Sequence, residues 1–357
     1  MTRKLVAPGL LTAAYVLAAC GGQTLSPGQE ETSADEPEIT ASLIEAIKTI
    51  TSARSADGIV PRLNQAKSLG CFDATLVIKD QLPSDLAQGV FQPGREYDAL
   101  VRFANASTED DRDKDFRGMS IKLYGVEGDT LWGQPGQQHF LLNSYPGLFA
   151  EDPAEFLAFV EATADDALWK FFINPTHWDA LRTVLRGREK ISNPFAVSFF
   201  STTPFRHGPD KSVAVKYAAL ACDAEQKEQA AADGPDFLRD AMAATLASRE
   251  VCFDFAVQFQ GDPAAMPIED ASVIWDEAES PYRSVATLHI EEQEFTTEAA
   301  LLDCERQTFN PWQSLPDHQP LGGINRVRRA VYSEAAAFRL EQSDFGRREA
   351  GGSRDQE

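Results

Sequence analysis

Short runs of β-branched and aromatic residues, bounded by Gly, Pro or Asp, recur along most of the chain. Such runs are typical of the strands of a barrel or sandwich. The pattern predicts strands at 75–79, 98–104, 119–124, 196–201, 212–217, 252–260 and 285–290.

Apolar residues with helical spacing separate these runs. One amphipathic helix is predicted to start near Thr40, because Leu43, Ile44, Ile47 and Ile50 share one stripe. Further helices are expected at 153–163, 165–173, 177–186, 235–248 and 326–342. The mixture predicts an α+β protein with a mainly antiparallel sheet, and no internal repeat is visible.

Size and charge narrow the function. The chain has 357 residues, of which 43% are hydrophobic, enough for one large core or two modest ones. Phe is the commonest aromatic residue, which suits a protein enclosing an apolar ligand and equally suits an ordinary large core. The formal net charge of −22 would repel phosphate backbones, so nucleic-acid binding is excluded as a function.

The N-terminus has the pattern of an export signal. Arg3 and Lys4 precede an apolar run, Leu10 to Ala19, which is too short to span a bilayer. The run ends Leu-Ala-Ala-Cys at Cys20 and resembles a bacterial lipobox. That resemblance implies cleavage after residue 19, lipidation of Cys20, and a protein anchored to a bacterial membrane and facing the periplasm or the exterior; the alternative is a plain signal peptide cut near Ala19.

The sequence divides into four parts. Residues 1–19 form the predicted signal, and residues 20–38 are polar and acidic, as expected of a flexible tether. Residues 39–342 form one domain, and the glycine-bearing tail 343–357 is expected to be disordered. Four further cysteines permit two disulfides, with three possible pairings left open by the sequence: Cys71, Cys222, Cys252 and Cys304.

The segment 321–339 (LGGINRVRRAVYSEAAAFR) carries the most informative polar residues. Arg328 and Tyr332 are four residues apart, so a helix would place them on one face with the guanidinium near the phenol oxygen. A ferric ion and an Arg on either side would favour the phenolate, a hard anionic ligand for iron. Arg339 lies two turns further along the same face. Taken alone, this spacing also fits a plain amphipathic helix.

The order of motifs along roughly residues 50–342 resembles the catalases. In that family a terminal R-x-x-x-Y supplies the proximal haem ligand, and an Arg seven residues on binds a haem propionate, so the resemblance assigns these roles to Tyr332 with Arg328, and to Arg339. The segment 62–72 (RLNQAKSLGCF) is similar to the family's R-V-V-H-A-K-G-x-G-x-F. It implies a propionate-binding role for Arg62.

Other segments extend the resemblance. The segment 101–123 is similar to the family's VRFS…D…RD.RGFA.KF, which gives Arg102 the second propionate role. The segment 141–156 (LLNSYPGLFAEDPAEF) places Asn143 on the distal asparagine and Phe156 on the phenylalanine over the haem. The stretches 252–259 and 267–275 resemble a barrel strand and the P-x-D-x-T-x-x-W segment. The resemblance implies an antiparallel β-barrel with surrounding helices that encloses haem, of the b type.

One residue departs from the family where the chemistry is most demanding. Catalases use a distal His to move a proton between the oxygens of hydrogen peroxide, and the matching position here is Gln65. A carboxamide donates and accepts hydrogen bonds but has no usable pKa near neutrality. General acid–base help is worth about 10²–10⁴ in rate, so we expect weak catalase turnover. Ala104 also replaces the serine that supports that histidine.

Three functions therefore remain open. The first is a peroxidase-like enzyme in which Gln65 and Asn143 bind hydrogen peroxide or an organic hydroperoxide. The second is a hydroperoxide isomerase of the allene oxide synthase type, and the third is a non-catalytic haem carrier or sensor. The chain lacks the long arm and the C-terminal helical region of catalases, so a monomer or dimer is expected rather than a tetramer.

Overall fold

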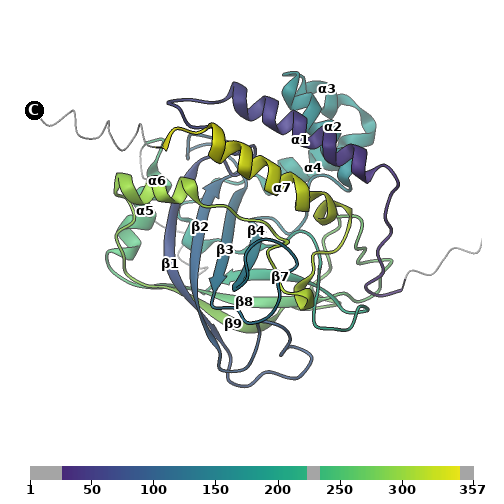
Figure 1. Cartoon of the computed structure of the whole chain (residues 1–357), viewed down its shortest axis with the longest axis vertical. Helices are drawn as coiled ribbons and strands as arrows, with labels where there is room; N and C mark the ends of the chain where they lie inside the picture. Colours follow the sequence, from purple (N-terminus) through teal and green to yellow (C-terminus); the bar gives the residue numbers. More distant parts are fainter. Residues whose placement is uncertain (1–25, 223–233, 346–357) are drawn as a thin grey trace, which may run out of the picture.

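The structure is a computed structural model that describes residues 26–222 and 234–345. Within this part of the chain, an antiparallel barrel is covered by helices on one side (Figure 1). None of the described helices is long and apolar enough to cross a bilayer. The predicted signal 1–19, Cys20 and the tail beyond residue 345 lie outside the described residues.

Eight antiparallel strands form a closed ring in the order β1-β2-β3-β4-β5-β7-β8-β9. The ring closes because β5 pairs with both β4 and β7 and β1 pairs with β9. A short ninth strand, β6 (Phe205–Arg206), pairs with β7. The strands of the ring are β1 (Ser68–Ile78), β2 (Glu96–Asn105), β3 (Arg117–Tyr124), β4 (Gln137–Asn143), β5 (Phe199–Phe200), β7 (Ala214–Ala221), β8 (Val251–Phe259) and β9 (Arg283–Ile290).

Alternate residues of each strand fill the barrel with apolar side chains. On β3, Met119, Ile121 and Leu123 are fully buried in the largest hydrophobic cluster. Phenylalanines dominate the rest of this interior, and the Phe103 ring packs edge-on against Phe72 with centroids 5.7 Å apart. Because side chains alternate in direction along a strand, the intervening residues of β1–β4 point outward, toward the helices.

In residues 26–222 and 234–345, seven α-helices lie outside the barrel, with α1, α2 and α7 packed on one another above it (Figure 1). An apolar stripe of α1 buries Leu43, Ile47 and Ile50 against Val327 and Val331 of α7. The helices are α1 (Glu36–Ala53), α2 (Pro153–Ala164), α3 (Leu168–Ile173), α4 (Trp178–Gly187), α5 (Phe237–Leu246), α6 (Glu298–Arg306) and α7 (Gly323–Gln342), with short 3₁₀ turns η1 (Pro175–His177), η2 (Pro194–Ala196) and η3 (Pro316–His318).

The predicted α+β class and the antiparallel barrel are confirmed, while strand β4, the two-residue strand β6 and helix α6 were not predicted. Strand β4 and helix α6 carry too weak an apolar pattern to be recognised in the sequence. The strand expected at 196–201 is reduced to the two residues of β5, because η2 occupies the positions before it.

The acidic segment predicted as a tether differs from expectation where it is described. Residues 26–38 lie against the domain, and α1 already begins at Glu36. Arg326 on α7 explains the difference, since its guanidinium pairs with Glu30 at 2.6 Å, Glu36 at 2.6 Å and Glu269 at 2.9 Å. The acidity of this segment thus balances a cation almost 300 positions away in the sequence.

Two disulfides settle the pairing that the sequence left open. Cys71 on β1 is bonded to Cys304 on α6, and Cys222 is bonded to Cys252 on β8. The first bond fixes the end of α6 against the outer face of β1, directly across from Arg102 on β2. It therefore holds the residues that follow Cys304 over the outward-pointing side chains of the barrel.

Candidate functional site

The outer face of β2–β4 carries polar residues that are nearly inaccessible to solvent. Arg102 of β2 pairs in register with Ser120 of β3, and Lys122 of β3 pairs with His139 of β4. Arg102, Lys122 and His139 are all less than 8% exposed. Buried charge on the outside of a barrel requires a partner that covers it, since desolvating an unpaired charge is expensive.

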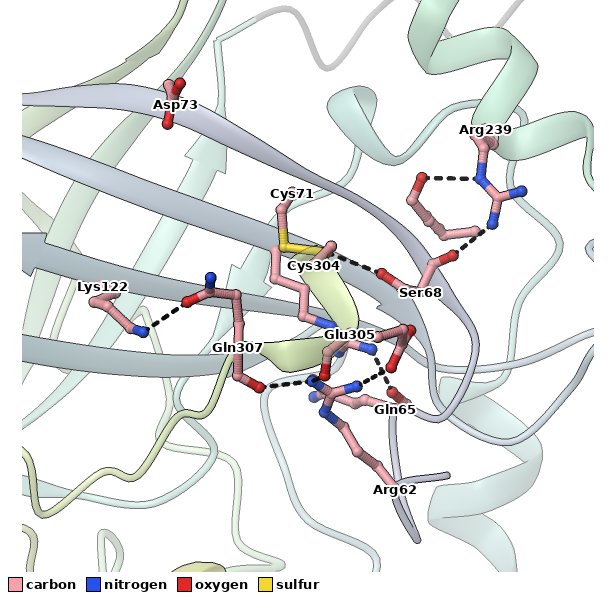
Figure 2. Close-up of a disulfide and its surroundings, with 12 residues drawn as sticks. Arg62, Gln65, Ser68, Cys71, Asp73, Lys122, Arg239, Cys304, Glu305 and Gln307 are labelled. Carbon is pink, nitrogen blue, oxygen red and sulfur yellow. Dashed lines mark hydrogen bonds and ion pairs between the residues drawn. A yellow bond between two sulfur atoms is a disulfide. The ribbon is translucent and has the colours of Figure 1, made fainter. Parts of the chain in front are cut away.

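Three arginines from different parts of the chain converge on the C-terminal end of α6 and the residue that follows it. Arg62 pairs with the Glu305 carboxylate at 2.6 Å and donates to the Gln307 carbonyl at 2.8 Å (Figure 2). Arg339 of α7 donates to the carbonyls of the same two residues. Arg102 lies close enough to influence Glu305 electrostatically. The sequence predicted all three arginines as propionate ligands, and the structure brings them together.

The cations of this cluster outnumber its anion. Burial lowers the pKa of Arg102 well below its ordinary value, with repulsion from Arg62 and Arg339 adding to the effect. Burial and Arg62 also lower the pKa of Arg339, to about 9. Burial alone would raise the pKa of Glu305, but the three arginines outweigh it and lower that pKa. The cluster is thus strained by excess positive charge, and an anionic ligand would relieve it.

Replacing Glu305 with Gln should destabilise the protein in a pH-dependent way. Because the folded-state pKa of Glu305 is lowered, its contribution is fully present above the ordinary value of 4.5 and is lost as the pH falls through the lowered pKa. We expect the free energy of unfolding to fall by about 1–3 kcal/mol near neutral pH, with the difference from the parent shrinking below pH 4.5.

Denaturant titrations of the haem-free protein across that pH range would measure the effect. Glu127→Gln is the matched control, because Glu127 pairs with Arg95 on the surface and its side chain is 83% exposed. A Glu305→Gln defect of the same size at every pH would contradict this account of the cluster.

Gln65 sits in a tight turn just beside the arginines. Its backbone has a φ of 55°, in the left-handed region that non-glycine residues seldom adopt. The turn is held because the Gln65 N–H donates to the Ala106 carbonyl and the Gln65 carbonyl accepts from Arg102, both at 2.9 Å. The backbone is therefore fixed in a costly conformation by its neighbours, a feature that often marks a functional position.

The Gln65 side chain lies directly on Gly118 of β3. A methyl group at Gly118 would overlap the Gln65 carboxamide, so the glycine permits this close approach of the Gln65 side chain. Gly118 pairs in register with Asn143, the last residue of β4. The two predicted distal residues, Gln65 and Asn143, thus both lie next to Gly118.

Asn143 keeps one donor free of the surrounding protein. Its Oδ1 accepts from the Ser144 N–H at 2.9 Å. Within residues 26–222 and 234–345, neither its Nδ2 nor the Gln65 carboxamide has a hydrogen-bond partner. Two amide side chains are therefore available to bind a polar ligand at this place.

Helix α7 places Arg328, Tyr332 and Arg339 on one stripe, as the spacing predicted. Arg328 donates to Thr203 Oγ1 and Asn325 Oδ1, both at 3.2 Å. In the described part of the chain it forms no hydrogen bond to Tyr332, which differs from the expected contact. Because Arg328 and Arg339 both reach the loops beside the barrel, helical spacing puts the Tyr332 ring on that same side, between them.

A segment between α6 and α7 connects this helix to the barrel. Asn310 donates through Nδ2 to the Arg329 carbonyl on α7, while its backbone N–H donates to His139 Nδ1 on β4. Burial lowers the pKa of His139 to about 3, with repulsion from Lys122 adding to the effect. His139 is therefore neutral and serves as a hydrogen-bond acceptor in this connection.

Phe156 on α2 lies at the meeting point of two apolar clusters. It packs against the α1–α7 cluster and also against the small cluster around Leu148 and Ile324. Its ring is 5.8 Å from Phe149, and Phe149 is 4.4 Å from Phe159 further along α2. The predicted aromatic residue is thus part of a row of three rings, Phe156, Phe149 and Phe159.

Comparison with solved structures identifies the architecture. A catalase A from Saccharomyces cerevisiae matches with a TM-score of 0.64 and 18% identity, over 80% of this chain and 62% of that chain. A fungal catalase matches with 0.64 and 20% identity, over 81% and 60%, and a bacterial catalase with 0.63 and 17% identity, over 95% and 68%. The chain has the catalase fold.

At these identities the likeness establishes the fold alone, and the chain spans only about 60% of the length of the first two catalases. No protein-family model matches the sequence, and no curated protein matches it. The fold that the resemblance implied is confirmed by these structural matches, and the roles of the motif residues stay predictions.

Sequence reasoning missed the residues that complete the arginine cluster on this catalase fold. Glu305 lies in the last turn of α6, a helix that was not predicted, and Gln307 follows that helix directly. The backbone carbonyls of these two residues accept hydrogen bonds from Arg62 and Arg339. Lys122 was also missed; its ammonium donates to Gln307 Oε1 at 2.9 Å (Figure 2). For Glu305 and Gln307, the only signal in the sequence was that an acidic residue, Glu305 itself, directly follows Cys304.

Proposed function

We propose that this protein binds haem and reacts with hydroperoxides as a peroxidase-like enzyme of low catalase activity. The observation that carries the proposal is the convergence of Arg62, Arg102 and Arg339 around a single carboxylate, Glu305. Three cations and one anion leave two positive charges, which match the two propionates of one haem. Tyr332, on the same helical stripe as Arg339, would supply the iron ligand.

The residues present fit a haem on a structural criterion independent of the family resemblance. The Arg102 Nε is buried and has no hydrogen-bond partner among the described residues. An orphaned buried donor costs about 1–3 kcal/mol, so its retention favours a ligand that accepts from it. A propionate is such an acceptor, and the two neighbouring arginines would share its charge.

Haem would supply a redox-active iron able to cleave an O–O bond, and the chain's own residues would set which substrates reach it. Gln65 and Asn143 would hold a hydroperoxide by hydrogen bonds from their amide groups. Neither residue has a pKa that permits proton transfer near neutrality. Orientation without proton transfer favours slow turnover of peroxides, with protons taken from water or from the electron donor.

A haem carrier is the second candidate, and one observation favours it. The Glu305 and Gln307 carbonyls and the Glu305 carboxylate fix the side chains of Arg62 and Arg339, so contacts within the protein order both guanidinium groups. A preformed site allows reversible binding at little reorganisation cost. The two amides at the distal positions would then serve only to line the site.

Turnover measurements on the haem-loaded protein distinguish these functions. A peroxidase uses two electrons and two protons from an added donor to reduce an organic hydroperoxide to an alcohol and water, or hydrogen peroxide to two waters. We therefore expect hydrogen peroxide or a fatty-acid hydroperoxide to disappear only when a donor is present and to be matched by its oxidation. Loss of fatty-acid hydroperoxide without a donor would instead indicate an isomerase. Haem transfer to an apo-globin with no turnover would indicate a carrier, and either result would overturn the proposal.

A further inference from the structure

The helical layer above the barrel exposes an unusual group of apolar side chains. Among the described residues, four large apolar side chains are more than half exposed, and all four lie on α3 and α4: Trp169 (61%), Ile173 (65%), Trp178 (56%) and Leu185 (69%). Single exposed apolar residues are ordinary on protein surfaces, but a local concentration of them marks an interaction site. We call residues 168–190 the aromatic hairpin.

The inner side of the aromatic hairpin is already packed. Phe171 is 5% exposed, and its ring lies 5.6 Å from Phe159 of α2 and stacks on His177 at 4.0 Å. Trp169 and Ile173 are four residues apart, on a different side of α3 from Phe171. The exposed side chains are therefore not part of the core, and the hairpin keeps its position without them.

Helix α4 has the pattern of a helix that lies at a membrane surface. Trp178, Leu181 and Leu185 share one stripe, and Arg182 and Arg186 border it. Arg182 pairs with Asp179, whereas Arg186 has no ion-pair partner in the part of the chain that the structure describes. Apolar and indole side chains bordered by basic residues are characteristic of interfacial helices.

The charge of the aromatic hairpin is opposite to that of the whole protein. Residues 168–190 contain five Lys or Arg and two Asp or Glu, a net charge of +3, on a chain whose net charge is −22. An anionic bilayer would repel the chain as a whole, and each basic residue near its surface contributes about 1 kcal/mol of attraction. The reversal of charge coincides with the exposed indoles and leucine, and a bilayer with anionic headgroups above an apolar interior complements both features at once.

We propose that the aromatic hairpin docks the protein onto an anionic lipid bilayer, with Trp169, Ile173, Trp178 and Leu185 in the headgroup region. The hairpin would orient the molecule, independently of lipidation at Cys20 and of haem binding. Helix α2, which carries Phe156, would then lie next to the bilayer, because α3 packs directly on α2. Figure 1 shows α3 and α2 together at the edge of the helical layer.

Vesicle binding by the chain without residues 1–20, which keeps every described residue, tests the proposal. We expect it to sediment with vesicles of phosphatidylcholine and phosphatidylglycerol, to bind pure phosphatidylcholine more weakly, and to be released by salt. Trp169→Gln combined with Leu185→Gln should lower the partition coefficient about tenfold or more. Arg186→Gln should lower it about fivefold on anionic vesicles alone.

A matched double variant, Tyr124→Gln with Ile274→Gln, removes one aromatic and one aliphatic exposed residue elsewhere and should bind like the parent. All variants change exposed positions, and equal thermal unfolding would verify their folding. Failure of the parent to bind anionic vesicles, or an equal loss in both double variants, would overturn the proposal. So would a parent dimer that the hairpin variant dissociates, because the surface would then be an interface between copies.

Discussion

Arg102→Met should weaken haem binding strongly while leaving the haem-free protein as stable as the parent or more so. Truncating one partner of a buried, hydrogen-bonded charge pair costs about 2–5 kcal/mol, so haem affinity should fall at least roughly 30-fold. The haem-free protein, by contrast, loses a buried cation whose pKa is already driven down by burial and by Arg62 and Arg339. Its free energy of unfolding should rise by about 1–2 kcal/mol.

Haem titration and denaturant titration of the same variant measure the two effects. Arg95→Met is the control, since Arg95 pairs with Glu127 at the surface and should alter neither quantity measurably. A structural arginine would give the opposite pair of results, namely a large loss of stability with unchanged haem affinity. That outcome would mean that Arg102 stabilises the barrel and does not bind a ligand.

Gln65→His should raise hydrogen peroxide disproportionation by at least tenfold. The substitution returns a group with a pKa near neutrality to the position where catalases carry their distal histidine, and such a group is worth about 10²–10⁴ in rate. The structure provides room for it, because the Gln65 side chain rests on a glycine, and the turn is fixed through backbone atoms that the substitution keeps.

Oxygen release by the haem-loaded variant and parent would measure this gain. Asn64→His places the same imidazole one residue away, at an exposed position of the same turn, and should leave the rate unchanged. A gain below tenfold for Gln65→His would show that the missing histidine does not explain the low turnover.

The sequence was sufficient for the fold class because its strongest patterns coincide with buried faces. Strands β2, β3 and β8 bury alternate residues inside the barrel and were predicted nearly to their ends. Strand β4 was missed because it begins with three polar residues, Gln137 to His139, whose burial depends on the segment between α6 and α7. Helix α6 was missed because Leu302 and Cys304 are its only buried residues, too few for a visible apolar stripe.

Only those residues of the candidate site that lie within the family motifs were predicted from the sequence. Arg62, Arg102 and Arg339 were found by position in those motifs, and the structure brings them together. Glu305 lies in no motif, and its role depends on the disulfide between Cys71 and Cys304 and on contacts across more than 200 residues. Such partners follow from the tertiary structure, which local patterns do not encode. The contact between Arg326 and residues 26–38, the described part of the predicted tether, also depends on the tertiary structure and was not predicted.

The absorption spectrum of the purified protein with haem, recorded beside that of Tyr332→Phe, tests haem binding through Tyr332 most directly. Tyr124→Phe, at the last residue of β3, is the control for removing a phenol group from the protein. The account predicts a high-spin ferric Soret band in the parent and the control that shifts or disappears in Tyr332→Phe. Absence of haem binding in the parent, or an identical band in Tyr332→Phe, would contradict it.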